Sequence, residues 1–239
     1  MNLKKIIIIP ARINSERLPQ KPLRLISNKP MINWTYEAAL NTSADLIKVA
    51  TDSKKIFNLF PNENAVMTSS NHISGTDRVY EAVSKIELKD NDVIINLQGD
   101  EPFIDPKDIN NLFDLVVNEE VKMATLYSEL QSTSELKDLN IVKILINNGT
   151  ALDFFRKTSI KENVFIHQGV YAFKYKTLQS FVNWDSSANE KKYKLEQFRA
   201  LDNGITINAI KSISKIHLGV DTEDDLKKAN EIAKKNSYK

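Results

Sequence analysis

The stretch IIIIPARINSERLPQKPLR, residues 6–24, joins an apolar run to a basic loop. Four consecutive isoleucines end at Pro10, and a short apolar run bounded by a turn residue is typical of a strand buried on both faces. Arg12, Arg17 and Lys21 follow in a segment that contains two further prolines and no glycine. The sequence therefore predicts a buried strand with cations held on a stiff loop at its carboxyl end.

The rest of the first half alternates between strand and helix patterns. Apolar runs predict three buried parallel strands, at 4–10, 45–52 and 90–100. Amphipathic stretches predict helices between and after them, at 30–42, 75–88 and 105–117, with Pro30 and Pro106 in first turns and Asp105 as a cap. This alternation predicts an α/β fold with a doubly wound, mostly parallel sheet, in which ligands bind beyond the carboxyl ends of the strands.

The second half has a different pattern. Strand-like segments occupy 121–130, 140–147, 150–155, 164–173 and 204–210, with a helix around 190–202 and a terminal helix from Thr222. We interpret them as a continuation of the sheet, with a smaller lobe inserted across its edge within about 121–204. The chain contains no linker, repeat or low-complexity tract, so residues 1–239 are predicted to form a single domain.

Composition excludes several classes of protein. The chain has 33 basic and 31 acidic side chains, a balance that argues against a dedicated nucleic-acid or membrane-surface binder. Cysteine is absent and the three histidines are far apart, which argues against disulfides, thiolate nucleophiles and zinc sites. No apolar run approaches the roughly 18 residues of a membrane helix, so we expect a soluble cytoplasmic protein without membrane insertion.

The six glycines exclude the common nucleotide-binding signatures. None of them fits the G-x-G-x-x-G fingerprint, the P-loop or the G-x-S-x-G nucleophile elbow. The basic loop offers another way to hold phosphate, because arginine presents a planar fork to phosphate oxygens and lysine a mobile charge. A solvated basic loop is the plain alternative, and the prolines favour a fixed site because they hold the cations in place.

Two aspartates are candidate metal ligands. Asp100 ends a buried strand in the segment INLQGDEPFI, and carboxylates together with phosphate oxygens are the usual ligands of Mg²⁺. Asp221 lies one residue before a capping-box pattern formed by Thr222 and Asp225, and this pattern leaves Asp221 itself without a structural role. The alternative for Asp100 is that it only caps a turn.

Other polar residues have plain structural interpretations on spacing alone. His167 and Tyr171 share one face of a predicted strand, and Glu196 and Gln197 begin a helical turn. In the segment SGTDRV, Ser74 or Thr76 is predicted to cap a helix, with Arg78 exposed.

Six segments of the chain, taken together and in order, resemble the 3-deoxy-manno-octulosonate (Kdo) cytidylyltransferase family. They run from Ile6 to about Ala229 and contain PAR…S.RLP.KPL, HxSGTDR, NLQGDEPFI, HQGVYAF, LEQFRALDNGI and GVDTEDDL. The resemblance implies a nucleotide-diphospho-sugar transferase-like fold. It also implies a reaction in which the anomeric hydroxyl of an acidic 2-keto-3-deoxy sugar attacks the α-phosphorus of CTP, giving CMP-sugar and pyrophosphate for lipopolysaccharide synthesis.

The resemblance also implies roles for individual residues. Arg12, Arg17 and Lys21 would hold the CTP phosphates, with Ser74, Arg78 and Gln98 lining the nucleotide pocket, and Asp100 and Asp221 would bind Mg²⁺; the catalytic set would be Lys21, Arg17, Asp100 and Asp221. His167, Tyr171, Glu196 and Gln197 would contact the sugar, and the inserted lobe would carry the sugar site and the contact of a homodimer. Gln20 occupies a position where the family usually has glycine, and the segment 156–167 is shorter than in the family.

Alternatives remain at this point. The sugar could be 8-amino-Kdo, sialic acid or pseudaminic acid, although Arg17-Leu18-Pro19 favours Kdo. A non-catalytic nucleotide-binding regulator on the same scaffold is a second alternative. The joint presence of Asp100, Asp221 and Lys21 argues against it, because a pure binder does not need a full set of metal ligands.

Overall fold

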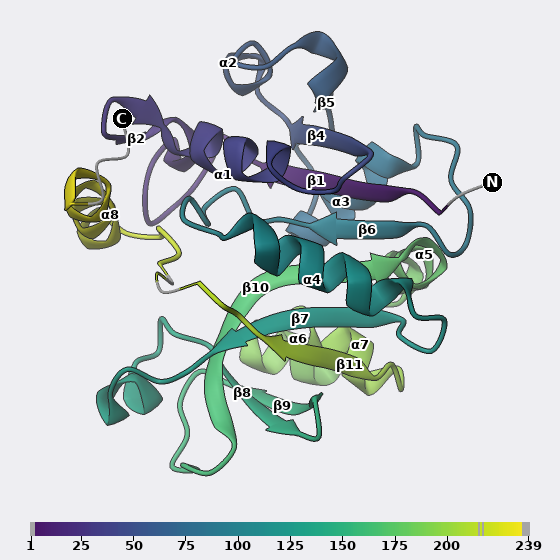
Figure 1. Ribbon diagram of the computed structural model, residues 1–239, viewed down its shortest axis with the longest axis vertical. Helices are drawn as coiled ribbons and strands as arrows, with labels where there is room; N and C mark the ends of the chain where they lie inside the picture. The colour runs from purple at the N-terminus through teal and green to yellow at the C-terminus, as the bar shows by residue number, and fades with distance from the viewer. Residues whose placement is uncertain (1–2, 215, 217, 236–239) are drawn as a thin grey trace.

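A nine-stranded sheet with helices on both faces forms the protein in the computed structural model, which describes residues 3–214, 216 and 218–235 (Figure 1). The strands follow the spatial order β5 (Ala65–Met67), β4 (Leu46–Thr51), β1 (Lys5–Ala11), β6 (Val93–Asn96), β10 (Val164–Lys174), β7 (Met123–Ser128), β11 (Ile207–Lys211), β9 (Thr150–Phe155) and β8 (Lys143–Asn147).

The two halves of the sheet differ in strand direction. Neighbouring strands from β5 to β6 are all parallel, as the alternating pattern predicts. From β10 onward most pairs are antiparallel, because β10 runs against β6, β7 and β8, and only β7 and β11 are parallel. The sheet is therefore mixed, and the prediction of mostly parallel pairing holds for its N-terminal half.

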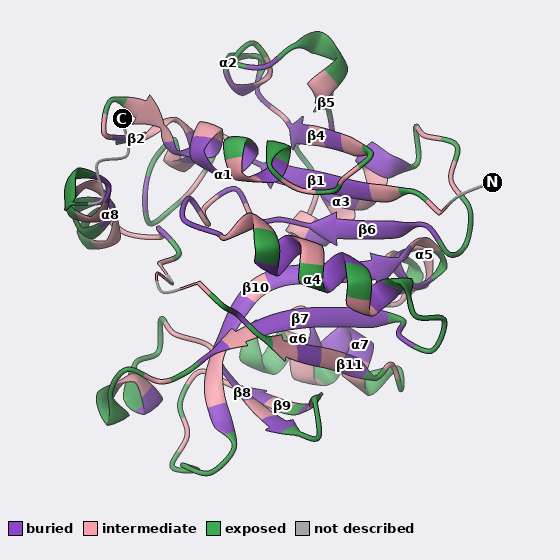
Figure 2. Cartoon of the chain, viewed as in Figure 1, coloured by how far each residue is buried: buried purple, intermediate pink, exposed green. Residues whose placement is uncertain are grey.

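Both faces of β1 are covered, which explains the isoleucine run. Ile7 and Ile9 pack into a core beneath α1 (Met31–Leu40) and α4 (Pro106–Val117). Ile6 and Ile8 pack into a second core on the opposite face, beneath helices that lie behind the sheet in Figure 1, namely α3 (Gly75–Val83), α5 (Tyr175–Asn183) and α7 (Phe198–Asp202). All four isoleucines are fully buried, as the purple colour of this strand shows in Figure 2.

Capping residues set the starts of the helices much as predicted. Asp105 accepts a hydrogen bond from the backbone N–H of Lys107 at the start of α4, and Ser74 forms a capping box with Asp77 at α3. Pro30 takes the cap position of α1, one residue before the predicted first turn. The single helix predicted around 190–202 is instead two short helices, α6 (Ala188–Tyr193) and α7.

The C-terminal helix α8 (Glu223–Lys235) packs on a small separate core. Leu226 and Ala229 of α8 contact this core, which also contains Leu18 and Ile26. Ile26 belongs to a two-stranded hairpin, β2 (Leu25–Ile26) and β3 (Lys29–Pro30). The sequence patterns did not predict this hairpin, which brings the end of the basic loop and the start of α8 together.

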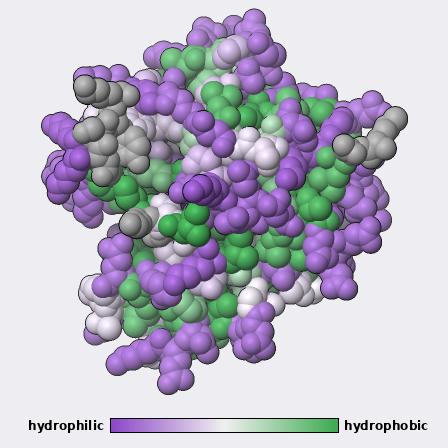
Figure 3. Space-filling model, in the orientation of Figure 1, coloured by the Kyte–Doolittle hydropathy of each residue, from purple (hydrophilic) through white to green (hydrophobic). Residues whose placement is uncertain are grey.

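The remaining elements are short. They are α2 (Lys54–Phe57) and the 3₁₀ turns η1 (Lys21–Leu23), η2 (Asn62–Asn64) and η3 (Thr133–Lys137). Apolar side chains break the hydrophilic surface of Figure 3 in several separate places, including the β8–β9 end of the molecule. Within the described ranges, none of the helices combines the length and apolar character needed to cross a bilayer.

Candidate active site

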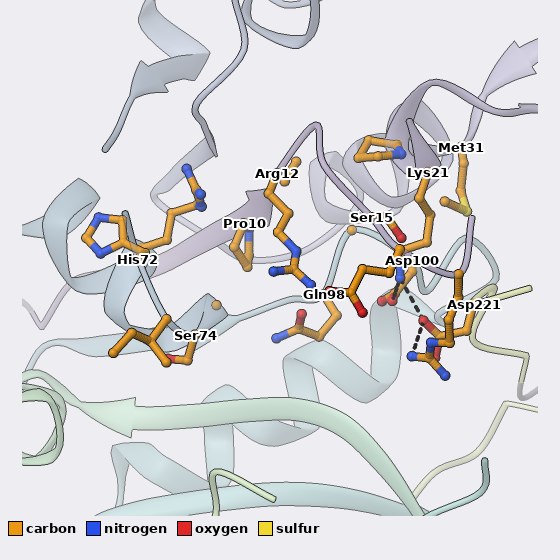
Figure 4. A pocket seen from close by; sticks show the side chains of 18 residues that line it. Pro10, Arg12, Ser15, Lys21, Met31, His72, Ser74, Gln98, Asp100 and Asp221 are labelled. Carbon is orange, nitrogen blue, oxygen red and sulfur yellow. Dashed lines mark hydrogen bonds and ion pairs between the residues drawn. The ribbon is translucent and has the colours of Figure 1, made fainter. Parts of the chain in front are cut away.

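A polar cavity of about 440 Å³ opens at the carboxyl ends of β1 and β6, beside the start of α3. This is the place where α/β sheets usually bind ligands. All eight residues predicted to bind nucleotide or metal line it, and Figure 4 labels most of them: Arg12, Arg17, Lys21, Ser74, Arg78, Gln98, Asp100 and Asp221. The structure therefore brings together residues that lie more than 200 positions apart in the sequence.

An ion-pair cluster forms the charged end of the cavity. The ammonium of Lys21 contacts Asp100 and lies 2.9 Å from Asp221, whose Oδ1 is also 2.9 Å from Nη2 of Arg17. Burial alone would lower the pKa of Lys21, but the two carboxylates outweigh it and raise that pKa. Burial likewise favours neutral Asp221, yet Lys21 and Arg17 hold the pKa of Asp221 below its ordinary value. Lys21 and Asp221 are therefore both charged at neutral pH.

Arg12 lies between the two ends of the cavity, with its guanidinium directed toward Gln98 in Figure 4. It is exposed and forms no ion pair with any residue that the structure describes. An unpaired guanidinium on a pocket wall is suited to bind an anionic ligand, because phosphate oxygens match its planar fork. Arg12 is thus available for phosphate without first breaking a salt bridge.

Arg78 is buried, whereas the sequence predicted it to be exposed, and its contacts anchor the basic loop. Its side chain is 4% exposed and binds Thr68 Oγ1 at 2.6 Å and Asp52 Oδ2 at 3.1 Å. The other oxygen of Asp52 accepts a hydrogen bond from the backbone N–H of Ile13 at 3.0 Å. Packing of α3 against the sheet buries the guanidinium, and the Asp52 pair then links α3 to the loop that carries Arg12.

Gln20 adopts a left-handed conformation, with φ at 54° and ψ at 36°, at the start of the turn that presents Lys21. This region of backbone conformation favours glycine, and a side chain there costs about 1–2 kcal/mol. The loop thus keeps a backbone suited to glycine although the residue is glutamine.

Ser74 lies at the end of the cavity opposite Lys21 and Asp100, and Gln98 lies between the two ends (Figure 4). Gly99 follows Gln98 and packs tightly, since a Cβ there would lie 2.7 Å from Cδ1 of Ile32 and 3.3 Å from the carbonyl oxygen of Pro10. A Cβ at this position would require the Ile32 side chain to move and the Pro10 carbonyl to give slightly. The glycine therefore sets the close approach of the β6 loop to β1.

The four residues predicted to bind sugar are not among the residues that line this cavity. His167, Tyr171 and Gln197 are buried, at 9%, 4% and 2% exposure. The ring of His167 packs on Phe154 and Tyr171, and its Nε2 lies 3.0 Å from Thr125 Oγ1. Burial lowers the pKa of His167 to about 3, so the imidazole is neutral at physiological pH.

Burial raises the pKa values of two acidic groups near the cavity. Burial raises the pKa of Glu196, although hydrogen bonds from Thr76 and Ser74 oppose the shift. Burial, with the nearby charges of Asp100 and Asp221, raises the pKa of Glu101 to about 8. Sequence patterns do not predict the raised pKa of Glu101, because it depends in part on Asp221, which is distant in the sequence and comes near Glu101 only in the folded chain.

His72 also lines the pocket, although the sequence patterns predicted no role for it. It lines the cavity next to Ser74, and its Nε2 lies 2.5 Å from Glu81 Oε2. The backbone N–H of Ser69 and the ammonium of Lys85 also bind Glu81, and despite its partial burial these partners hold the pKa of Glu81 at about 2. The ionised carboxylate thus fixes the position of His72, and the spacing HxSGTDR was the available signal.

The donor set fits a hard divalent cation only in part. Asp100 and Asp221 reach one common point, the ammonium of Lys21. Among the described residues, no group of three or more histidine, cysteine or acidic side chains is arranged to hold a metal. Mg²⁺ usually keeps waters and binds one or two carboxylates together with substrate phosphates. The two aspartates fit this mode, in which the substrate supplies the remaining ligands.

Comparisons with known proteins agree with the geometry. The chain matches the Cytidylyltransferase family over residues 6–213. It is 37% identical to the 3-deoxy-manno-octulosonate cytidylyltransferase of Photobacterium profundum, over 95% of this chain and 98% of the relative. It is 38% identical to the enzyme of the same name from Coxiella burnetii, over 93% of this chain and 96% of the relative.

Solved structures give the same result. A CMP:2-keto-3-deoxy-manno-octonic acid synthetase complexed with CTP superimposes with a TM-score of 0.88 at 35% identity, covering 98% of this chain and 99% of the other. A putative glucose-1-phosphate thymidylyltransferase from Bacillus anthracis, with a TM-score of 0.69 and 15% identity over 97% of this chain and 95% of the other, shares the fold alone. The matched fold, the phosphate-suited pocket and the extent of the sequence identity lead to one conclusion: the chain belongs to the 3-deoxy-manno-octulosonate cytidylyltransferase family.

Proposed function

We propose that this protein transfers CMP from CTP to Kdo, giving CMP-Kdo and pyrophosphate for lipopolysaccharide synthesis. The observation that carries the proposal is the cavity itself, which places Arg12, Lys21, Asp100 and Asp221 around one space on the scaffold of a CTP-bound relative. Cations beside carboxylates in one cleft suit a polyphosphate and its metal.

The reaction is an in-line displacement at phosphorus. The anomeric hydroxyl of the sugar gives up its proton to solvent as its oxygen bonds to the α-phosphorus of CTP, the bond from that phosphorus to the bridging oxygen breaks, and pyrophosphate leaves with the electron pair. Such transfers depend mainly on positioning and on neutralising the charge that develops. Arg12 is free to bind phosphate, and Lys21 and Arg17 can turn to it from Asp221.

Mg²⁺ is the metal that we propose for Asp100 and Asp221. When bound, it would neutralise phosphate charge and lower the pKa of the attacking hydroxyl. Lys21 now contacts both carboxylates, so a cation that replaces its ammonium there would free Lys21 for the phosphates. Asp100 and Asp221 would thus pair with Lys21 in the absence of substrate and with Mg²⁺ when CTP is bound.

The acidic sugar is proposed to bind toward β10 and α7, where His167, Tyr171, Glu196 and Gln197 lie. Supporting this placement, the Nε2 of Gln197 is buried without a hydrogen-bond partner in the part of the chain that the structure describes. A buried unpaired donor is costly. A hydroxyl or carboxylate of a bound sugar would satisfy it.

We also propose a cytoplasmic homodimer that forms through the region 121–204. Leu139, Leu152 and Ile160 support this, because they are large apolar side chains with exposures of 60%, 53% and 43%, on β9 and on the segments that precede β8 and follow β9. Leu152→Lys should shift sedimentation toward the monomer. Leu40→Lys, on α1 at 54% exposure, is the matched control that should leave the oligomer unchanged.

Pyrophosphate release tests the function directly. The assay contains CTP and Mg²⁺ with Kdo, 8-amino-Kdo, sialic acid or pseudaminic acid in turn. Fastest turnover with Kdo is expected, and a preference for another sugar would reassign the substrate. Binding of CTP with no release from any sugar would favour the regulator alternative.

A further inference from the structure

A chain of buried hydrogen bonds runs from Glu196 to the nucleotide pocket. Thr76 Oγ1 donates to Glu196 Oε1 at 2.8 Å, and Asn96 Nδ2 donates to Thr76 Oγ1 at 3.0 Å. Gln98 Nε2 then donates to Asn96 Oδ1 at 3.0 Å. Thr76 and Asn96 are fully buried, so no water competes for these groups. The chain thus joins α3, the end of β6 and the start of α7.

The chemistry of Glu196 gives this chain a direction. Hydrogen bonds from Thr76 and Ser74 and the charge of Arg199 favour the ionised form of Glu196 against its burial. A carboxylate can only accept, so the single hydrogen of the Thr76 hydroxyl is used toward Glu196. The Thr76 oxygen can then only accept, which requires the amide nitrogen of Asn96 to face it. The Asn96 oxygen is left for the amide nitrogen of Gln98. Reversing either amide would place two acceptors or two donors opposite each other, at the cost of a buried unpaired group.

The last amide in the chain therefore presents its oxygen outward. Gln98 lines the cavity, and within the described residues no group donates to its Oε1. In Figure 4 its side chain lies between Ser74 and the phosphate-suited end at Lys21 and Asp100, and its amide lies next to Gly75 at the start of α3. A nucleotide whose phosphates occupy the charged end would place its nucleoside at Gln98. A fixed acceptor there favours a nucleoside group that donates a hydrogen bond.

We propose that Thr76 and Asn96 are positioning residues that lock the Gln98 carbonyl toward the base, where it selects cytosine over uracil. Cytosine carries a donating exocyclic amino group at the position where uracil carries an accepting oxygen. A site that holds a fixed polar partner rejects the mismatched analogue, because two acceptors are then left facing each other. The inference rests on the proposed use of CTP and deepens it.

Binding of CTP and UTP by calorimetry, without sugar, tests this independently of turnover. Wild type should bind CTP at least about tenfold more tightly than UTP, on the scale of one hydrogen bond gained against one mismatch. Thr76→Val removes the directing hydroxyl at nearly constant volume, so this preference should largely disappear. Thr76→Ser should restore it. Thr177→Val is the matched control: Thr177 is a buried threonine of α5 outside this hydrogen-bond chain, and its replacement should leave the preference for CTP unchanged.

Gln98→Leu gives a second test on the pocket wall, should Thr76→Val not fold. It should weaken CTP binding to the level of UTP and leave UTP binding close to wild type. Equal weakening of both nucleotides in Thr76→Val or Gln98→Leu would overturn the proposal, as would a wild type that does not discriminate. If discrimination follows these variants while no sugar supports pyrophosphate release, the proposed function fails and this inference stands.

Discussion

Two groups of polar residues are predicted to act on substrates, and the two groups differ in burial. One lies at the charged end of the cavity. The other is the buried cluster near β10 and α7, which consists of His167, Tyr171, Glu196 and Gln197. The side chain of Arg17 is 54% exposed and that of Asp221 is 36% exposed, whereas His167 and Gln197 are 9% and 2% exposed. Groups at the charged end can exchange partners when a ligand arrives, because water and neighbouring charges compensate them. Groups in the buried cluster are fixed by packing, and they act through the positions in which the fold holds them.

This difference predicts opposite responses to substitution. At the charged end, variants should affect activity far more than stability, since partly exposed ion pairs contribute little to folding. In the buried cluster, variants should change stability and its pH dependence as well. Each of the following tests sharpens or breaks this contrast.

The largest effect is expected from Asp100→Asn and Asp221→Asn. Each removes one anionic ligand proposed for Mg²⁺, and activity should fall about a thousandfold or more. If Asp221 served only the start of α8, Asn would be nearly silent there, since it caps a helix about as well. Turnover across a Mg²⁺ titration, with melting curves in EDTA, measures both effects.

Asp224→Asn is the matched control for this pair, because Asp224 begins the same helix at 80% side-chain exposure and pairs only with Lys227 among the described residues. It should retain full activity. The double variant of Asp100 and Asp221 should lose little more than either single variant, because residues that act as a unit are not additive. Full activity of Asp221→Asn at low Mg²⁺ would leave Asp100 alone with the metal.

A smaller loss is expected from Lys21→Ala. Removing one preorganised cation should reduce transition-state stabilisation by about 2–4 kcal/mol, which lowers kcat/KM roughly 30- to 1000-fold. The unfolding free energy should change little in Mg²⁺, where the cation neutralises both aspartates. Steady-state kinetics and chemical denaturation test this, and an unchanged kcat/KM would contradict a phosphate role for Lys21.

His167→Gln should change the pH dependence of stability. The native pKa of His167 is about 3, below the ordinary 6.5, so the unfolded chain binds more protons between these values. This group therefore contributes stability above pH 6.5 that is lost as the pH falls toward 3, by at most about 1.4 kcal/mol per pH unit. Denaturation of wild type and variant at pH 5, 6 and 7 should show a steeper fall for wild type; parallel curves would indicate a solvated imidazole.

The smallest effect is expected from Gln20→Gly. Glycine relieves the strain of the left-handed conformation, but it also has greater entropy in the unfolded chain, which offsets part of the gain. The unfolding free energy should therefore rise by about 0.5–1 kcal/mol. Melting temperature measures it. A drop would indicate that contacts of the glutamine side chain outweigh its backbone strain.

Much of the fold could be predicted from short-range patterns. The isoleucine run, the Asp105-Pro106 start of α4 and a helix cap at Ser74 or Thr76 each depend on residues a few positions apart, and the structure confirms the first two and places the cap at Ser74. The β2–β3 hairpin and the division of the helix at 190–202 had no comparable local signal. The antiparallel half of the sheet depends on β10, which pairs with strands from three different parts of the chain.

The sequence by itself determined which residues carry charge at the ends of buried strands, because a strand's burial and its following loop are local properties. It could not determine that Arg78 is buried against Asp52, that Lys21 joins Asp100 to Asp221, or that Thr76 directs Asn96. Those contacts link segments 20 to 200 positions apart. Only tertiary packing brings such segments together, and only burial makes the direction of a single hydroxyl hydrogen matter.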